Sequence, residues 1–416
     1  MSRVPAAVTL VLLLVALGVA LAVVVPWTPL PGADLQPDAA RDFTAAERAR
    51  EEAYSSSVRP PAYSSLGLGL LVAAVLGFTP LGARLVELVA RPLGGGWAWR
   101  VLLGTIALTL VGRLVTLPLA ARVEVVRRDV GLSTRDWTGW AADLGKGWLV
   151  STVLTAVALL VLVALARAAP RTWWAWGAAA TAALVVVVSF GYPVLVEPLF
   201  NRFTPLPAGE LRDDLLELAE RDGVPVEDVL VADASRRTTA LNAYVSGFGQ
   251  TRRIVVYDTL LESAPPEEVQ LVVAHELAHA KHQDVLTGTL LGALGAAAAV
   301  VALALVLSWS PLLRLAGVEG PGDGRAVALV LALTALASFA VAPVSNLVSR
   351  RVEARADVSS LDLTRDVDTF VETQKRLART NLSDLEPNPV AYALFATHPS
   401  TTERLSLARE WERLRS

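Results

Sequence analysis

Long apolar stretches alternate with charged segments along this chain. Seven of the apolar stretches are long enough to cross a lipid bilayer as helices, which takes about 20 residues each. They cover residues 7–26, 65–89, 101–121, 148–167, 173–196, 286–309 and 326–346. The first is longer than the apolar core of a signal peptide and no A-x-A cleavage site follows it, so we interpret it as a span too. The pattern predicts a mainly α, polytopic membrane protein with seven transmembrane helices.

Three other segments do not have the pattern of a membrane span. Residues 197–284 are charged and mixed in pattern, and residues 347–416 are strongly charged with helical periodicity. Residues 27–64 are rich in Pro, Ala and acids and are predicted to form a loop. We therefore expect four regions, namely helices one to five (1–196), a catalytic region (197–285), helices six and seven (286–346) and a second catalytic region (347–416).

The composition supports the membrane interpretation. Of the 416 residues, 53% are hydrophobic and 19% are charged, and the mean hydropathy is +0.48. There is no cysteine, which excludes disulfides, thiolate metal sites and cysteine nucleophiles. The net charge of −3 gives no indication of nucleic-acid binding.

The distribution of Lys and Arg between the loops predicts an orientation. With seven spans the loops alternate between two sides, and one side holds residues 27–64, 122–147 and both charged regions. This side is the richer in positive charge, which is typical of the cytoplasm. We therefore expect a plasma-membrane protein with its N-terminus outside and both charged regions in the cytoplasm.

One basic residue, Arg113, lies inside the third span. An arginine within a membrane span often marks a functional site. It can also snorkel to the interface, or pair with a nearby acid such as Glu124. Both interpretations stay open on the sequence.

The segment "AHELAHAKHQD" (274–284) contains three of the four histidines of the chain. His275 and His279 are four apart, so a helix places both imidazoles on one face, where they can bind one metal ion. Glu276 adjoins the first histidine and can act as a general base on a metal-bound water. The alternative, a core helix with buried histidines, predicts no third ligand. His282 lies too far along the helix axis to join the other two and is interpreted as a supporting or solvated residue.

A third ligand is expected in "SRRVEARAD" (349–357), just after the last span. Glu353 and Asp357 share a helix face, so Glu353 can bind the ion while Asp357 accepts a hydrogen bond from a ligand histidine. Alone, this segment would be interpreted as a solvated charged helix.

The fourth histidine is His398 in "ATHPSTTERL". It is either a surface-loop histidine or a donor to the oxyanion that forms when water attacks a carbonyl.

Together these segments resemble the type I CAAX prenyl endopeptidases, which are integral-membrane zinc metallopeptidases of the gluzincin kind. The similarity extends beyond the histidine motif. It also includes "VGLSTRDWTGWAADLGKG" (130–147), "VEPLFNRFTPLPAGELRDDLLELAERDGVP" (196–225) and "LNAYVSGFGQTRRIVVYDTLLE" (241–262), followed by HELAH, SRRVEARAD and HPSTTERL in the family's order.

This resemblance implies a site and a fold. It implies one zinc ion bound by His275, His279 and Glu353, Glu276 as the base, Asp357 and Asp284 in support of the ligands, His398 in transition-state stabilisation, and Asn242, Ala243 and Tyr244 on an edge strand that binds a peptide or protein substrate. The implied fold is a ring of seven membrane helices around a chamber, with a zincin-type α+β protease domain. Ala278 and Leu241 depart from the family's usual residues.

Three other functions fit the sequence less well. A quality-control protease similar to HtpX has fewer spans. A silent scaffold would be expected to have a damaged site, and the site residues here are complete. A transporter would be expected to have paired broken helices in its two halves, for which there are too few Gly-Pro breaks.

Overall fold

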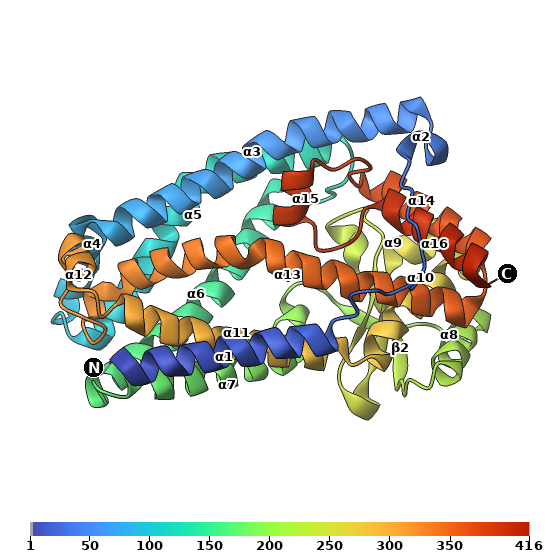
Figure 1. The fold of residues 1–416 in the computed structure, drawn as a ribbon. Coiled ribbons are helices and arrows are strands. Elements are labelled where there is room, and N and C mark those ends of the chain that lie inside the picture. Colours follow the sequence, from blue (N-terminus) through green and yellow to red (C-terminus); the bar gives the residue numbers. More distant parts are fainter. Residues whose placement is uncertain (1–2, 416) are drawn as a thin grey trace.

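The computed structural model describes residues 3–415, which form a bundle of long helices with one small sheet at one end (Figure 1). Seven helices of the described part are long and apolar enough to cross a membrane, which confirms the predicted number. They are α1 (Arg3–Val24), α3 (Ala45–Phe78), α5 (Trp97–Asp129), α6 (Trp137–Ala168), α7 (Trp173–Leu195), α11 (Asp284–Val306) and α13 (Val327–Thr364).

The remaining helices are shorter and most of them surround the sheet. They are α2 (Ala39–Asp42), α4 (Pro80–Ala90), α8 (Glu210–Arg221), α9 (Asp258–Ser263), α10 (Pro266–Lys281), α12 (Ser310–Ala316), α14 (Val367–Asn381), α15 (Pro389–Phe395) and α16 (Thr401–Arg415). The sheet contains β1 (Phe203–Pro205), β2 (Asp228–Ala232), β3 (Ala243–Ser246) and β4 (Arg253–Tyr257), in the order β1-β2-β4-β3. Strand β3 is therefore an edge strand.

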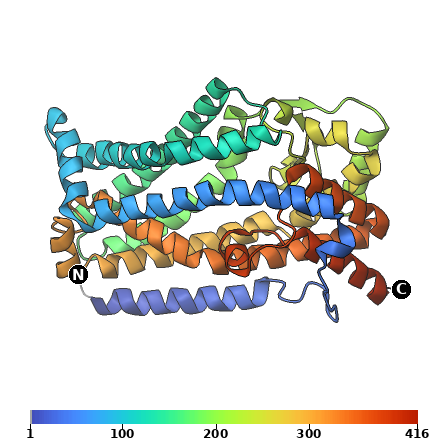
Figure 2. The same ribbon diagram turned by 90° about the horizontal axis from the view of Figure 1, so that it is seen from above.

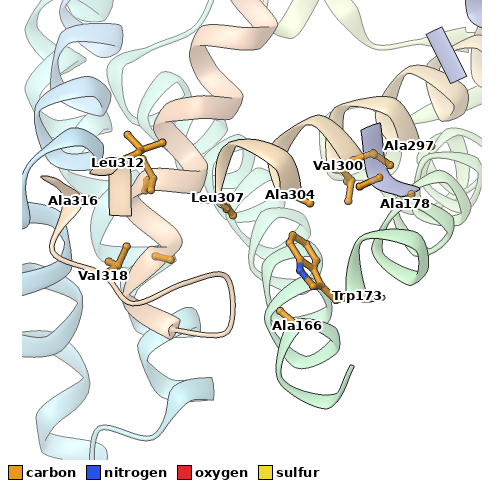
Figure 3. Packing of buried hydrophobic residues seen from close by; sticks show 14 of the residues in the cluster. Ala166, Trp173, Ala178, Ala297, Val300, Ala304, Leu307, Leu312, Ala316 and Val318 are labelled. Carbon is orange, nitrogen blue, oxygen red and sulfur yellow. The ribbon is translucent and has the colours of Figure 1, made fainter. Parts of the chain in front are cut away.

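The long helices pack as neighbours in a fixed order. α3 packs on α5 and α13, α5 on α6, α6 on α7, and α7 on α11, while α1 lies along α11 (Figure 2). Gly77 lets α3 approach α13 closely, since a Cβ added there would lie 2.3 Å from the Cβ of Ala332. The large apolar cluster around Trp173 lies where α7 and α11 meet, and it is rich in alanine, as close helix packing in membranes requires (Figure 3).

The prediction of a loop over 27–64 is wrong for its second half, because α3 begins at Ala45. Thr44 and Glu47 form a capping box, which satisfies backbone N–H groups at the start of the helix. The helix then continues through Pro60 and Pro61. Those prolines, which made the segment look irregular, remove two backbone donors without ending the helix.

The structure also bears on one expected region boundary and on one possible ion pair. α13 is continuous from Val327 to Thr364, so the expected boundary between residues 346 and 347 falls inside one helix. Arg113 does not pair with Glu124, because that carboxylate accepts hydrogen bonds from Ser133 and Arg135 instead, at 2.5 and 3.0 Å.

Candidate metal centre

The helix α10 places the HExxH segment beside the sheet. It starts with Pro266 at its first position and acids in its first turn, both favourable at a helix N-terminus. Its apolar face packs into the protease core. Since His275 and His279 are one turn apart, their Nε2 atoms converge to 3.3 Å.

Glu353 of α13 completes the group. Its Oε2 lies 3.2 Å from the Nε2 of His275 and 3.7 Å from the Nε2 of His279. In the part of the chain that the structure describes, these three residues are the one group whose donor atoms cluster closely enough, within 4.8 Å of one another, to bind a metal ion. Two imidazoles and one carboxylate are the donor set of many catalytic zinc sites.

Each histidine is oriented by an aspartate at its other ring nitrogen. Asp357 lies 2.9 Å from the Nδ1 of His275, and Asp284 lies 2.9 Å from the Nδ1 of His279. A proton held on Nδ1 in this way leaves the lone pair of Nε2 free for a metal ion. The arrangement therefore fits a divalent cation.

Two arginines fix these aspartates and were not predicted from the sequence. Arg404 donates to both carboxylate oxygens of Asp357, with its Nε 2.8 Å from Oδ2. Arg355 donates to Asp284. Arg404 belongs to the segment that contains His398, and Arg355 lies between Glu353 and Asp357, but nothing in their spacing shows which acid each one meets.

The charges around α10 favour a cation at this point. Burial lowers the pKa of His279, but its hydrogen bonds to Asp284 and Glu353 outweigh that effect and raise the pKa to about 10. A site that binds a proton so firmly also attracts a metal ion in its place. Burial also raises the pKa of Glu276, although His275 and His279 partly oppose it. A raised pKa suits a carboxylate that must accept a proton near neutral pH.

His398 reaches the site from the loop between α15 and α16. Its Nε2 lies 3.4 Å from Oε2 of Glu353, while 60% of the side chain stays exposed towards the cleft. Arg350 of α13 holds this loop, donating to the carbonyl oxygens of Tyr392 and Ala396 at 3.1 and 2.6 Å. His282 lies apart from the three donors and contacts Ser359 Oγ at 3.1 Å, so it stays outside the group, as predicted.

Two hollows meet at this centre and form one cleft. Their volumes are about 540 and 480 Å³, and Asn242, Glu276 and His398 line both. The edge strand β3 borders the smaller hollow, where Ala243 and Tyr244 also lie. Residues of β3 and Glu276 therefore line the same hollow.

A bundle of membrane helices with a His-His-Glu centre and a neighbouring glutamate defines an integral-membrane metallopeptidase. The chain belongs to peptidase family M48, which its residues 205–412 match. Residues 47–202 match the CAAX prenyl protease N-terminal region of five membrane helices. These matches confirm the family predicted from the motifs.

Individual relatives agree with this assignment. The chain is 35% identical to an uncharacterized metalloprotease, YhfN of Bacillus subtilis, over 73% of this chain and 72% of that protein. It is 32% identical to a CAAX prenyl protease 1 homolog of Arabidopsis thaliana, over 63% of this chain and 62% of that one. The crystal structure of S. mikatae Ste24p has the same fold, with a TM-score of 0.76 and 21% identity over 98% of this chain and 99% of that chain. The alternatives of an HtpX-like protease or a silent scaffold are not favoured.

Proposed function

We propose that this protein is a zinc endopeptidase whose site is formed by His275, His279, Glu353 and Glu276. The convergence of the first three side chains next to the fourth supports this most directly. A zinc ion bound there would supply a water of lowered pKa and polarise the substrate carbonyl. Glu276 takes a proton from the attacking water and delivers it to the leaving amine. His398 donates from Nε2 to the oxygen that becomes negative.

The substrate class follows from the walls of the cleft. The smaller hollow is lined by Val285 and Leu286 at the start of α11 and by Val352 of α13. Phe248, in the same wall, packs against Phe190 of α7 with ring centroids 5.3 Å apart. These apolar side chains belong to, or contact, helices that span the membrane. We therefore assign peptides and the tails of membrane-associated proteins as substrates, and curated relatives are named CAAX prenyl proteases.

A comparison of membrane fractions tests this function. Cells with the wild-type protein and cells with Glu276→Gln are analysed by quantitative proteomics of termini. The proposal expects membrane-associated precursors that stay uncut only in the variant. Identical terminal peptides in both strains, with both proteins present at equal levels, would contradict it.

We also propose that the metal centre faces the cytoplasm, with the N-terminus outside. The loops richest in arginine support this, and they lie at the sheet end of the bundle, where Asp42 pairs with Arg409 and Glu47 with Arg379. Because the chain has no cysteine, a single introduced thiol is a unique probe. We expect a membrane-impermeant maleimide to label Arg171→Cys in intact cells, and Ser263→Cys only after permeabilisation. The reverse pattern would invert the orientation.

His398→Ala is expected to lower kcat about 100- to 1000-fold with little change in KM, the range typical of losing one oxyanion donor. The reason is that His398 acts on charge that exists only in the transition state. Steady-state kinetics on one peptide substrate check this. Thr397→Ala is the matched control, since it removes the 2.9 Å contact to Nδ1 of His398 but leaves Nε2 in place. The fall in kcat should be smaller in this control than in His398→Ala. A change confined to KM would make His398 a binding contact instead.

A further inference from the structure

We infer that the side chain of Asn381 closes one end of the peptide-binding edge of β3 and so limits how far a substrate pairs with that strand. This inference rests on the proposed peptidase function, because it concerns the same cleft. It goes further by assigning a specificity-determining role to a residue outside the metal centre.

The register of β3 shows which residues offer their backbone to a peptide. The carbonyl of Asn242 accepts a hydrogen bond from the N–H of Tyr257, at 3.1 Å. In an antiparallel pair, residues whose backbone groups face the partner strand alternate with residues whose groups face away. Asn242 and Tyr244 therefore face β4, whereas Leu241, Ala243 and Val245 present N–H and C=O to the open side.

Asn381 occupies the first of these outward positions. Its Oδ1 accepts a hydrogen bond from the N–H of Leu241 at 3.0 Å, and its Nδ2 donates to the carbonyl of Leu241 at 3.3 Å. These are the two bonds that one residue of an added strand would make. The side chain thus takes the place of a peptide at Leu241, and among the described residues no strand pairs with Ala243 and Val245 on that side.

The backbone around Asn381 is arranged for this contact. Asn381 is the last residue of α14, and Leu382 after it has a φ of 50°, in the left-handed region that is costly for a leucine. The chain therefore turns sharply, and the amide of Asn381 lies against the strand. Leu241 itself is only 3% exposed, so its N–H and C=O would be unsatisfied without a partner.

Other contacts confine the open edge further. Before Leu241, Thr238 forms a β-bridge with Ser133 from the loop between α5 and α6. After Val245, the chain turns at Gly247, where φ is 90° and an added Cβ would lie 2.4 Å from the carbonyl oxygen of Thr251. The free edge spans Ala243 to Val245, enough to pair with about three residues of an extended peptide.

Because Asn381 lies in the cleft, the short free edge of β3 affects which substrates can bind. Asn242, Glu276 and His398 line both hollows, so with Glu276 as the base the bond to be cut is expected where the two hollows meet. Asn381 lines only the larger hollow, together with Gln374 and Tyr392. On that side of the cut bond, a substrate must stop pairing with β3 at Ala243 and enter the larger hollow. Asn381 therefore selects against substrates that would continue as an added β-strand.

The test compares peptide length with Asn381 present and absent. Full-length protein with Glu276→Gln, which binds without cutting, is mixed with a proteome-derived peptide library, and the retained peptides are sequenced. With Asn381→Ala added, the freed backbone of Leu241 can pair with the substrate through two more hydrogen bonds. Retention of peptides that are longer by two or more residues on one side should then rise about tenfold relative to short ones, which corresponds to the usual strength of two such bonds.

Two controls separate this role from a structural one. Asn381→Asp keeps the volume and the acceptor for the N–H of Leu241 but loses the donor to its carbonyl, so it should still exclude a peptide there and favour long peptides far less than Asn381→Ala does. Amide exchange should show faster exchange at Leu241 in Asn381→Ala. An equal loss of retention at every peptide length in Asn381→Ala, or an unchanged ratio of long to short retained peptides, would overturn the inference. If the wild-type protein, with Glu276 intact, cuts nothing, the proposed function fails; if it cuts and the ratio of long to short retained peptides is unchanged by Asn381→Ala, only the role of Asn381 fails.

Discussion

Glu276→Gln is expected to bind as much metal as the wild-type protein and to lose about 100- to 10,000-fold in peptide turnover, the range typical of removing a general base. Glutamine has nearly the same size, so the packing of α10 around it should persist. It cannot accept a proton from water, however, and the neighbouring ligands His275 and His279 are unchanged. Metal content by mass spectrometry, together with cleavage of a fluorogenic peptide, checks both halves of this prediction.

A matched control lies on the same helix. Glu267 is exposed in the first turn of α10, and Glu267→Gln makes the same chemical change away from the cleft. Its turnover should equal that of the wild-type protein. If Glu276→Gln bound metal fully and still cut peptides at the normal rate, another group would have to be the base.

The part of the site built on local spacing could be predicted from the sequence. His275 and His279 follow from the helical repeat, because residues four apart share one face. Asp357, four residues after Glu353, follows from the same rule. The structure places Asp357 2.9 Å from the Nδ1 of His275.

The residues missed by sequence reasoning act across long separations. Arg404 meets Asp357 from 47 residues away, and Asn381 meets Leu241 from 140 residues away. No local pattern specifies such a pair, because the contact depends on how α14 and α16 pack on α10 and the sheet.

The fold, too, could be predicted only in part from the sequence. The membrane spans are long apolar runs, and their number follows from the hydropathy pattern along the chain alone. The start of α3 at Ala45 depends on one capping box, whose signal (Thr44 with Glu47) was present in the sequence but was outweighed by the two prolines further on. A cap stabilises a helix by about 0.5–2 kcal/mol, less than the ~3 kcal/mol cost of one interior proline, so the packing of α3 on α5 and α13 is what keeps it helical through Pro60 and Pro61.

Glu353→Gln should lose turnover because it loses the metal, whereas Glu276→Gln should lose turnover with the metal still bound. The carboxylate of Glu353 lies within 3.2 to 3.7 Å of both ligand nitrogens, and an amide is neutral and a far weaker ligand. We expect the metal affinity to fall about 100-fold or more, by analogy with the 10- to 100-fold losses seen when only the supporting residues of a site are changed. Turnover should fall with it and recover partly when zinc is added in excess.

The comparison of the two variants tests the architecture as well as the chemistry. Glu353 lies on α13, the last membrane-length helix, whereas His275 and His279 lie on α10, before α11. A metal ion bound by all three would join α10 to α13 and thereby tie the protease domain to two membrane spans. Metal-loaded wild-type protein should therefore melt at a higher temperature than the chelated protein, and Glu353→Gln should lose this difference while Glu276→Gln keeps it. Glu372→Gln, an exposed change on α14, should behave as the wild type. Full metal retention by Glu353→Gln in the presence of a chelator would place the third ligand elsewhere.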